Sequence, residues 1–444
     1  MTLRARPVPG LTKPRRAKQP TLSERTLANG LRVVAVRRGG VPMVHLRLRV
    51  PFAGRHADHL PKRLVLDATM TAGTSTHSRG ELAVALQEVG GALSVSTDTD
   101  RLLLRGESLR SGLPRMLELL AELLTDAQYP KDAVAGEVSR LQTQLQQRLS
   151  QPGEIAAEAL RRRLYDGHPY GRDLPDPEDI AAVTAGAVRK LHRRWVVPPG
   201  SLLVVVGDIT PARVLDQVDK AFAGWSGEAT KPAPAPGRPT GGDLTLVDRP
   251  GAVQSNLRLG GDGLSRRDDA YAALSLANVA FGGYFASRLT QNIREDKGYT
   301  YSPRSGLVHA ATASGFVLEV DVATEVTGPA LVEISYELGR IATAPITSSE
   351  LESAVNYLTG LLALQTATQA GLAGVLETLL ADGLDVSWLR DHAAALARAT
   401  ADDVLEQARR FLAPAGLATI VVGDASVVGD DLTALSPVVT RDAS

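Results

Sequence analysis

The sequence predicts an α+β protein of two homologous domains, each a largely antiparallel sheet with helices packed on one face. The first observation is an internal repeat: residues 180–208 align without a gap on residues 396–424, and twelve of 29 positions are identical. The second is that strand patterns precede long helical patterns in both halves, which is typical of layered α+β domains. The third is a stretch rich in proline and glycine between the two copies.

These observations define the domain boundaries. We expect a first domain at 21–226, a semi-extended linker at 227–242 that contains KPAPAPGRPTGG, and a second domain at 243–435. Residues 1–20 carry six basic side chains, four prolines and no acid, and are expected to form a disordered basic tail. A nucleic-acid or lipid-binding arm is the alternative for this tail. Residues 436–444 are expected to form a C-terminal tail.

The first half begins with strand patterns. Residues 21–50 alternate as two strands about the hairpin signal Asn29-Gly30. Ser78 and Glu81 form a capping box, which predicts the start of a helix.

That helix is expected to end at the glycine pair 90–91, with strands following through Leu104. Amphipathic helices are predicted at 113–127 and 131–149. Each copy of the repeat then adds a helix with a threonine N-cap and an apolar strand that ends at Gly-Asp.

The second half repeats this plan with a helix, a glycine break, a second helix, two strands and further helices. These elements are expected at about 268–281, at Gly282 and Gly283, up to Glu295, at about 299–308 and 315–323, and over most of 329–412.

Composition excludes several classes of function. Lys plus Arg and Asp plus Glu both count 49, so no global field attracts the chain to nucleic acid or to an anionic membrane. Cysteine is absent, which excludes disulfides, thiolate metal sites and a cysteine nucleophile, and favours a reducing compartment. No apolar run is long enough for a secretory signal or a membrane span. We therefore expect a cytoplasmic protein.

The run FGGYFASRLTQNIREDKGYTYSPRS at 281–305 carries the clearest functional signal. It places Arg294 at the end of a predicted helix, Gly298 at its break and Tyr301 on the next strand. This run, within a two-half chain, resembles the arginine and tyrosine motif in the second half of the M16 zinc peptidases, the family of pitrilysin, insulin-degrading enzyme and mitochondrial processing peptidase. The resemblance implies that family's fold, with the two domains arranged as a clamshell.

The first half resembles an M16 half whose zinc motif has degenerated. An M16 catalytic half carries HxxEH on a helix, where two histidines hold zinc and the glutamate acts as base. Residues 62–100 resemble such a half, and the glycine–threonine pair at 73–74 matches the pair that follows the zinc helix. With that anchor, Leu64 and Ala68 occupy the histidine positions and Asp67 occupies the glutamate position.

The distal glutamate ligand is also missing, because its position falls near Gln144. We therefore expect no metal in this chain, and Asp67 is expected to be a solvated helix residue. His56 and His59 form an i,i+3 pair that zinc could bridge, but the surrounding GRHADHLPK is interpreted as loop. His168, in HPYGR, is expected to serve local turn packing.

The resemblance implies a role inside a heterodimer. In some M16 enzymes one subunit carries HxxEH and the other carries the arginine and tyrosine. This chain would then be the zinc-free subunit, contributing Arg294 and Tyr301 in trans to bind the substrate carbonyl and stabilise the oxyanion at the partner's zinc. Its partners would be an HxxEH-bearing homologue and a peptide substrate, and alone it would be inactive.

Several alternatives stay open at this point. Arg294 could simply pair with Glu295 or Asp296, with Tyr301 half-buried in a strand. The chain could be a structural or peptide-binding protein of the same fold, or a self-contained hydrolase, although no GxSxG motif supports the last. Gly282 and Gly283 are interpreted as a tight helix break whose backbone could also line the peptide path; they form no phosphate-binding pattern.

Overall fold

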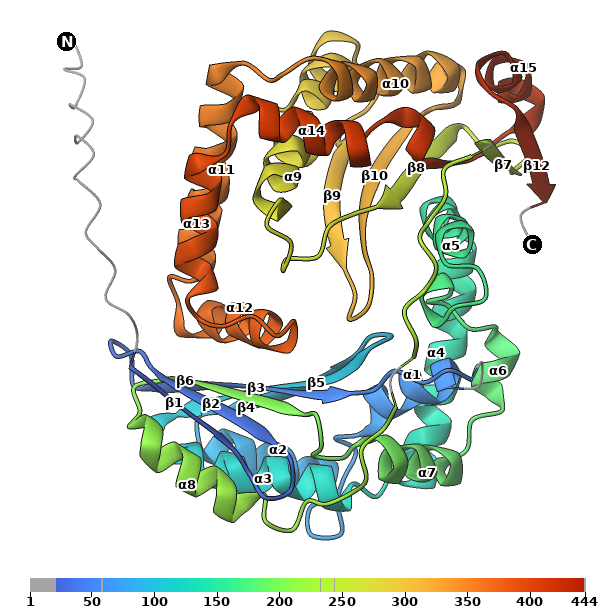
Figure 1. The fold of residues 1–444 in the computed structure, drawn as a ribbon. Helices are drawn as coiled ribbons and strands as arrows, with labels where there is room; N and C mark the ends of the chain where they lie inside the picture. Colours follow the sequence, from blue (N-terminus) through green and yellow to red (C-terminus); the bar gives the residue numbers. More distant parts are fainter. Residues whose placement is uncertain (1–20, 57–58, 232, 243, 443–444) are drawn as a thin grey trace, which may run out of the picture.

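Two six-stranded sheets form the frame of the molecule in the computed structural model, which describes residues 21–56, 59–231, 233–242 and 244–442 (Figure 1). The expected basic tail at 1–20 lies outside the described residues. The first sheet has the order β1-β2-β6-β3-β5-β4 and the second has the order β12-β7-β11-β8-β10-β9. Five strands of each half occupy equivalent positions, as the internal repeat predicted, whereas the outer strands differ: β1 is antiparallel to β2, and β12 is parallel to β7.

Most neighbouring strands are antiparallel; the parallel pairs are β2 with β6, β7 with β11, and β7 with β12. The strands of the first sheet are β1 Leu22–Thr26, β2 Arg32–Arg37, β3 Met43–Pro51, β4 Ala92–Thr97, β5 Arg101–Leu109 and β6 Leu202–Gly207. Those of the second are β7 Leu244–Asp248, β8 Gln254–Asp262, β9 Arg304–His309, β10 Ser314–Ala323, β11 Ala418–Gly423 and β12 Val438–Asp442.

Helices cover one face of each sheet, which confirms the α+β class. Those of the first half are α1 His59–Thr69, α2 Arg79–Glu88, α3 Leu113–Asp126, α4 Lys131–Leu149, α5 Pro152–Leu164, α6 Pro177–Ala181, α7 Ala185–Trp195 and α8 Pro211–Ala221. Those of the second are α9 Tyr271–Asn278, α10 Thr327–Thr343, α11 Ser348–Gln365, α12 Gln369–Ala381, α13 Trp388–Arg398, α14 Ala401–Phe411 and α15 Ala425–Leu435, with two π-helical turns, η3 Val279–Gly283 and η4 Thr290–Asp296.

Local sequence signals explain where several helices begin. The Ser78 side chain accepts a hydrogen bond from the Glu81 backbone N–H, and the Glu81 carboxylate accepts one from Ser78 in return, so the capping box at α2 is confirmed. Thr184 and Thr400 cap α7 and α14, the two equivalent helices of the repeat. Each cap satisfies backbone N–H groups that the first turn leaves without partners.

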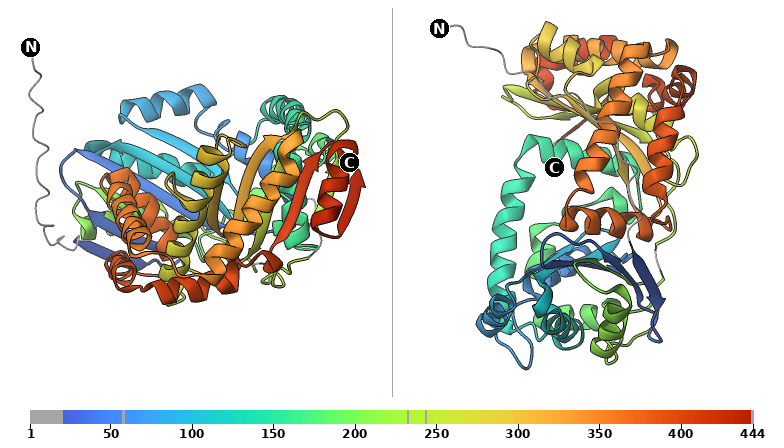
Figure 2. Two further views of the ribbon diagram at one scale, coloured as in Figure 1. Left: turned by 90° about the horizontal axis from the view of Figure 1, so that it is seen from above. Right: turned by 90° about the vertical axis from the view of Figure 1, so that its left-hand side faces the viewer.

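Each half extends one helix onto the open face of the other half's sheet (Figure 2). Helix α12 packs Leu372 and Leu376 against Val34 and Val204 of the first sheet. Helix α5, which directly follows α4 as α12 follows α11, packs its apolar side on the second sheet at β11. The sheets therefore bury apolar residues on both faces, and burial between the halves ties them together.

Polar contacts reinforce this junction. Glu377 of α12, 4% exposed, binds Arg49 at 3.3 Å and Arg101 at 3.2 Å on the first sheet. At the other side, Asp100 accepts hydrogen bonds from the Tyr170 hydroxyl and from the Ala311 backbone N–H, both at 2.7 Å. The turn between β4 and β5 therefore meets the turn between β9 and β10.

The structure corrects several expectations. Residues 21–50 form three strands rather than two, because a turn at Gly39-Gly40 separates β2 from β3. The segment 436–444, expected to be a tail, contributes β12 to the second sheet. Helix α1 begins at His59, inside the stretch that was expected to be loop. Among the described residues, no helix is both long and apolar enough to cross a membrane.

Candidate functional site

The chain turns sharply at Gly282 and Gly283, where η3 ends. A Cβ atom at Gly282 would lie 2.8 Å from the Ser305 hydroxyl oxygen, and one at Gly283 would lie 2.7 Å from the Asn278 side-chain nitrogen. The Ser305 hydroxyl in turn donates a hydrogen bond to the Asn278 side chain at 2.8 Å. Side chains larger than hydrogen do not fit here, so the two glycines let η3 pack tightly against β9. A role for their backbone in lining a peptide path stays a prediction.

The turn that follows is fixed by a buried ion pair. Arg288, 6% exposed in its side chain, makes a two-pronged contact with Glu350 of α11, at 2.6 and 2.9 Å. The Arg288 guanidinium lowers the pKa of Glu350 to about 2. The Ser287 and Thr290 hydroxyls also meet at 2.9 Å. The residues between η3 and η4 are therefore held from two directions.

A left-handed glycine closes η4 and redirects the chain. Gly298 has φ +68°, and the Tyr299 backbone N–H donates to the Ile293 carbonyl at 2.9 Å. The Tyr299 side chain packs against the core, while the Thr300 hydroxyl donates to the Asp321 carbonyl of β10 at 2.7 Å. These anchors leave Tyr301 pointing away from the core, with 82% of its surface exposed.

The surroundings of Tyr301 therefore differ from the strand that was expected. Tyr301 lies before β9, which begins at Arg304, and is not on the strand. Tyr299 and Tyr301, which alternation along a strand would place on one face, do not share a face: the Tyr299 ring packs against the core and the Tyr301 ring is exposed.

Arg294 and Tyr301 nevertheless meet. The Arg294 guanidinium carbon lies 5.0 Å from the Tyr301 ring centroid and 4.6 Å from the ring centroid of Phe285. Its Nε is 3.5 Å from the carboxylate of Glu295, so the local ion pair is long. The Arg294 side chain is 27% exposed. The cluster presents a guanidinium and a phenol, two groups that can donate hydrogen bonds to a carbonyl oxygen.

The residues at the zinc-motif positions do not fit a metal. Leu64 is partly buried and packs on the first core, and Ala68 offers no ligand atom. Asp67 is not the solvated residue that was expected: its carboxylate accepts the Thr97 backbone N–H at 2.9 Å and the Thr97 hydroxyl at 3.1 Å. Burial raises the pKa of Asp67. This carboxylate ties α1 to the end of β4.

The other residues considered as metal ligands either contact other groups of the chain or lie exposed. Gln144 is exposed on α4. The His59 ring is buried and its Nε2 lies 2.9 Å from the Phe52 carbonyl oxygen, whereas His56 is exposed. His168 contributes to the local turn, as expected, because its Nδ1 accepts the Tyr170 backbone N–H at 3.2 Å. No group of three or more potential metal ligands comes together within the described part of the chain.

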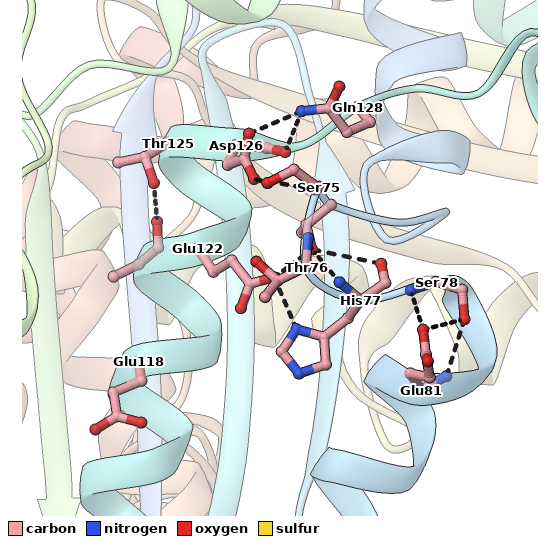
Figure 3. A network of polar contacts seen from close by, with 12 residues as sticks. Ser75, Thr76, His77, Ser78, Glu81, Glu118, Glu122, Thr125, Asp126 and Gln128 are labelled. Atoms are coloured by element: carbon pink, nitrogen blue, oxygen red, sulfur yellow. Dashed lines mark hydrogen bonds and ion pairs between the residues drawn. The ribbon is translucent and has the colours of Figure 1, made fainter.

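The loop after α1 is held by its own polar network (Figure 3). The Glu122 carboxylate of α3 contacts the His77 Nδ1 at 2.8 Å and the Thr74 hydroxyl. Burial of Glu122 opposes ionisation, but these hydrogen bonds lower its pKa overall. The Asp126 carboxylate accepts the Ser75 backbone N–H at 3.0 Å. The glycine–threonine pair at 73–74 thus keeps a rigid turn although the metal ligands are absent.

The sequence predicted that Arg294 and Tyr301 act together, but it did not predict the contact of Phe285 with Arg294 or the Arg288–Glu350 pair. An apolar residue two positions after a glycine pair gives no sequence signal for exposure. An ion pair that joins residues 62 positions apart follows no local periodicity.

Comparisons with known proteins identify the family of the chain. A family model described as "Insulinase (Peptidase family M16)" matches residues 63–178, and one described as "Peptidase M16 inactive domain" matches residues 182–358. An uncharacterized zinc protease of Streptomyces coelicolor is 26% identical over 78% of this chain and 77% of its own. One of Bacillus subtilis is 24% identical over 76% of this chain and 83% of its own.

Solved structures show the same fold. A peptidase M16 inactive domain from Pseudomonas fluorescens superposes with a TM-score of 0.82 at 23% identity, over 91% of this chain and 98% of that chain. A protease from Helicobacter pylori superposes with a TM-score of 0.83 at 20% identity, over 91% and 100% of the two chains. With the two family models, which together span most of both halves, these findings show that the chain belongs to the M16 peptidase family.

Proposed function

We propose that this protein is the zinc-free subunit of a heterodimeric M16 peptidase. It would pair with an HxxEH-bearing homologue and contribute Arg294 and Tyr301 to peptide hydrolysis at the partner's zinc. The observation that carries the proposal is a contrast within one chain. The guanidinium and phenol form one cluster with an exposed ring, whereas α1 offers Leu64 and Ala68 where the family has metal ligands.

The chemistry asked of the pair is hydrogen-bond donation. When water attacks a peptide carbonyl, negative charge grows on the carbonyl oxygen, and donors fixed before the reaction stabilise it. A guanidinium provides charged N–H donors and a phenol provides an O–H. Loss of one such donor typically costs roughly 3 kcal/mol of barrier, or about a hundredfold in kcat. The partner supplies the metal and its water, and the peptide is bound in extended form.

The same geometry argues against a purely structural role. The two exposed rings contribute little to stability, because a cation–π contact at an exposed site is worth only about 0.5–1 kcal/mol. A structural or peptide-binding protein remains the alternative. The absence of cysteine favours a reducing compartment, and on that ground we place the heterodimer in the cytoplasm.

Co-expression with an HxxEH-bearing homologue tests the proposal. The purified pair should cleave a quenched fluorescent peptide, and neither chain alone should do so. Arg294→Ala and Tyr301→Phe should each abolish most cleavage while the two chains still co-elute. Arg304→Ala is the matched control, because Arg304 is an exposed arginine on β9 that pairs with Glu319. Full activity in both site variants would favour the structural alternative.

A further inference from the structure

Phe285 is an exposed aromatic residue with a specific neighbour. Its surface is 63% exposed, although a phenylalanine normally gains free energy by burial. Its ring centroid lies 4.6 Å from the Arg294 guanidinium carbon. The Tyr301 ring contacts the same guanidinium at 5.0 Å. One cation therefore contacts two aromatic rings, from the turn before η4 and from the segment after it.

The position of Phe285 is built into the fold. Tyr284 is extended, with φ −152° and ψ 171°, and directly follows the tight turn at Gly283. On the other side, Arg288 is clamped to Glu350 and the Ser287 backbone N–H donates to the Tyr284 carbonyl at 3.2 Å. The ring is thus presented by a short segment with fixed ends.

Aromatic contact positions an arginine differently from an ion pair. A carboxylate binds the N–H groups of a guanidinium and so occupies the donors that a substrate would need. An aromatic ring contacts the guanidinium through its π face and leaves the N–H edge available. Glu295, at 3.5 Å from Nε, competes for these donors. Two rings shift the balance toward the conformation with its donors free.

We infer that Phe285 is a positioning residue for Arg294, forming with Tyr301 an aromatic clamp that keeps the guanidinium directed at the substrate carbonyl. The role of the clamp in catalysis rests on the proposed function, whereas the contact of the two rings with Arg294 does not depend on it. Removing one ring should lower kcat by roughly tenfold, which corresponds to about 1.4 kcal/mol, and should leave KM nearly unchanged.

The clamp can be tested in the isolated chain. In a deuterated sample, the Arg294 Nε–Hε resonance is assigned by its loss in Arg294→Lys. Ring currents should displace it from the position of a free arginine. Phe285→Leu should move it back toward that position, and Phe285→Tyr should retain the displacement. Leu364→Ala is the control, because Leu364 is 72% exposed on α11. An unchanged resonance in Phe285→Leu would overturn the inference.

The role of the clamp is tested in the heterodimer with the zinc-bearing homologue. Phe285→Leu should reduce kcat about tenfold and Phe285→Tyr should restore it. If Phe285→Leu cleaves as fast as the unmodified chain while Arg294→Ala is inactive, the positioning role is overturned and the proposed function stands. If Arg294→Ala is itself fully active, the proposed function fails and the role of the clamp fails with it. Equal melting temperatures separate these effects from unfolding.

Discussion

The helical regions that connect β3 to β4 and β8 to β9 occupy corresponding places in the two sheets but differ in what they present. In the first half, Leu64 packs on the core at one ligand position of α1, and Asp67, at the position of the glutamate base, contacts Thr97. In the second half, η4 and the residues after it present Arg294 and Tyr301. The two regions share one arrangement of strands but present different groups: α1 presents packing contacts, and η4 with the residues after it presents a guanidinium beside an exposed phenol ring.

Metal ligands placed on α1 and α4 should remove the difference between the two regions. Leu64→His, Asp67→Glu, Ala68→His and Gln144→Glu together should bind about one zinc ion per chain, because the histidines would stand at i and i+4 on α1 and the carboxylate would come from α4, which contacts α1. Zinc is measured by mass spectrometry after dialysis. The control keeps Ala68 and changes the other three positions. If the full variant binds no more zinc than the control, the four ligand positions alone do not make a metal site in this chain.

A second prediction concerns the junction that holds the two regions in one body. Glu377→Ala should lower the free energy of unfolding by about 3 kcal/mol, because it leaves Arg49 and Arg101 without their buried carboxylate. Urea unfolding measures this. Glu406→Ala, at an exposed site on α14, should change it by less than about 0.5 kcal/mol. Equal losses in the two variants would show that the junction does not depend on this ion pair.

A third prediction concerns the effect of pH on the Arg288–Glu350 ion pair of the second region. The pKa of Glu350 is lowered from 4.5 to about 2 in the folded protein. Its stabilising contribution is therefore present above about pH 5 and is lost as pH falls toward 2. Glu350→Gln should cost about 2 kcal/mol at neutral pH, which is less than the full pKa shift would give because solvent screens this partly exposed carboxylate, and should flatten the acid limb of the stability curve. Glu352→Gln is the control on α11. A steep acid limb that persists in Glu350→Gln would refute the assignment.

The smallest effect concerns the glycine turn. Gly282→Ala should destabilise the protein by about 1–2 kcal/mol, since the added methyl group meets Ser305. Gly306→Ala on β9 should be near neutral, because no neighbouring atom lies within 4 Å of its added carbon. Thermal unfolding compares the two. The tight-packing explanation fails when both variants melt at the same temperature.

Much of the fold could be predicted because its signals are local. The capping box at Ser78 and the threonine caps at 184 and 400 each depend on residues a few positions apart, and the structure has all of them. The repeat predicted two equivalent domains because identical positions recur at one offset. The strand expected at about 315–323 is β10, Ser314–Ala323, because the pattern of a strand is also local in the sequence.

Contacts between distant residues could not be predicted. Helix α5 packs on β11 and α12 packs on β6, strands that are far away in the sequence and belong to the other half, and β12 pairs with β7 across nearly two hundred residues. Tyr301 was expected on a strand. The turn at Gly298 and the hydrogen bond from the Thr300 hydroxyl to β10 instead place it in a segment that is not strand. Phe285 was missed because its exposure depends on the turn before it.

The most direct test of the central claim is the turnover rate of the heterodimer with Arg294→Lys. Lysine keeps the charge but cannot reproduce the planar fork of donors, so kcat should fall about a hundredfold while assembly and melting temperature stay unchanged. The rate is measured at saturating peptide, with Arg304→Lys as control. A kcat equal to that of the unmodified pair would contradict the claim that this chain donates a group to the reaction.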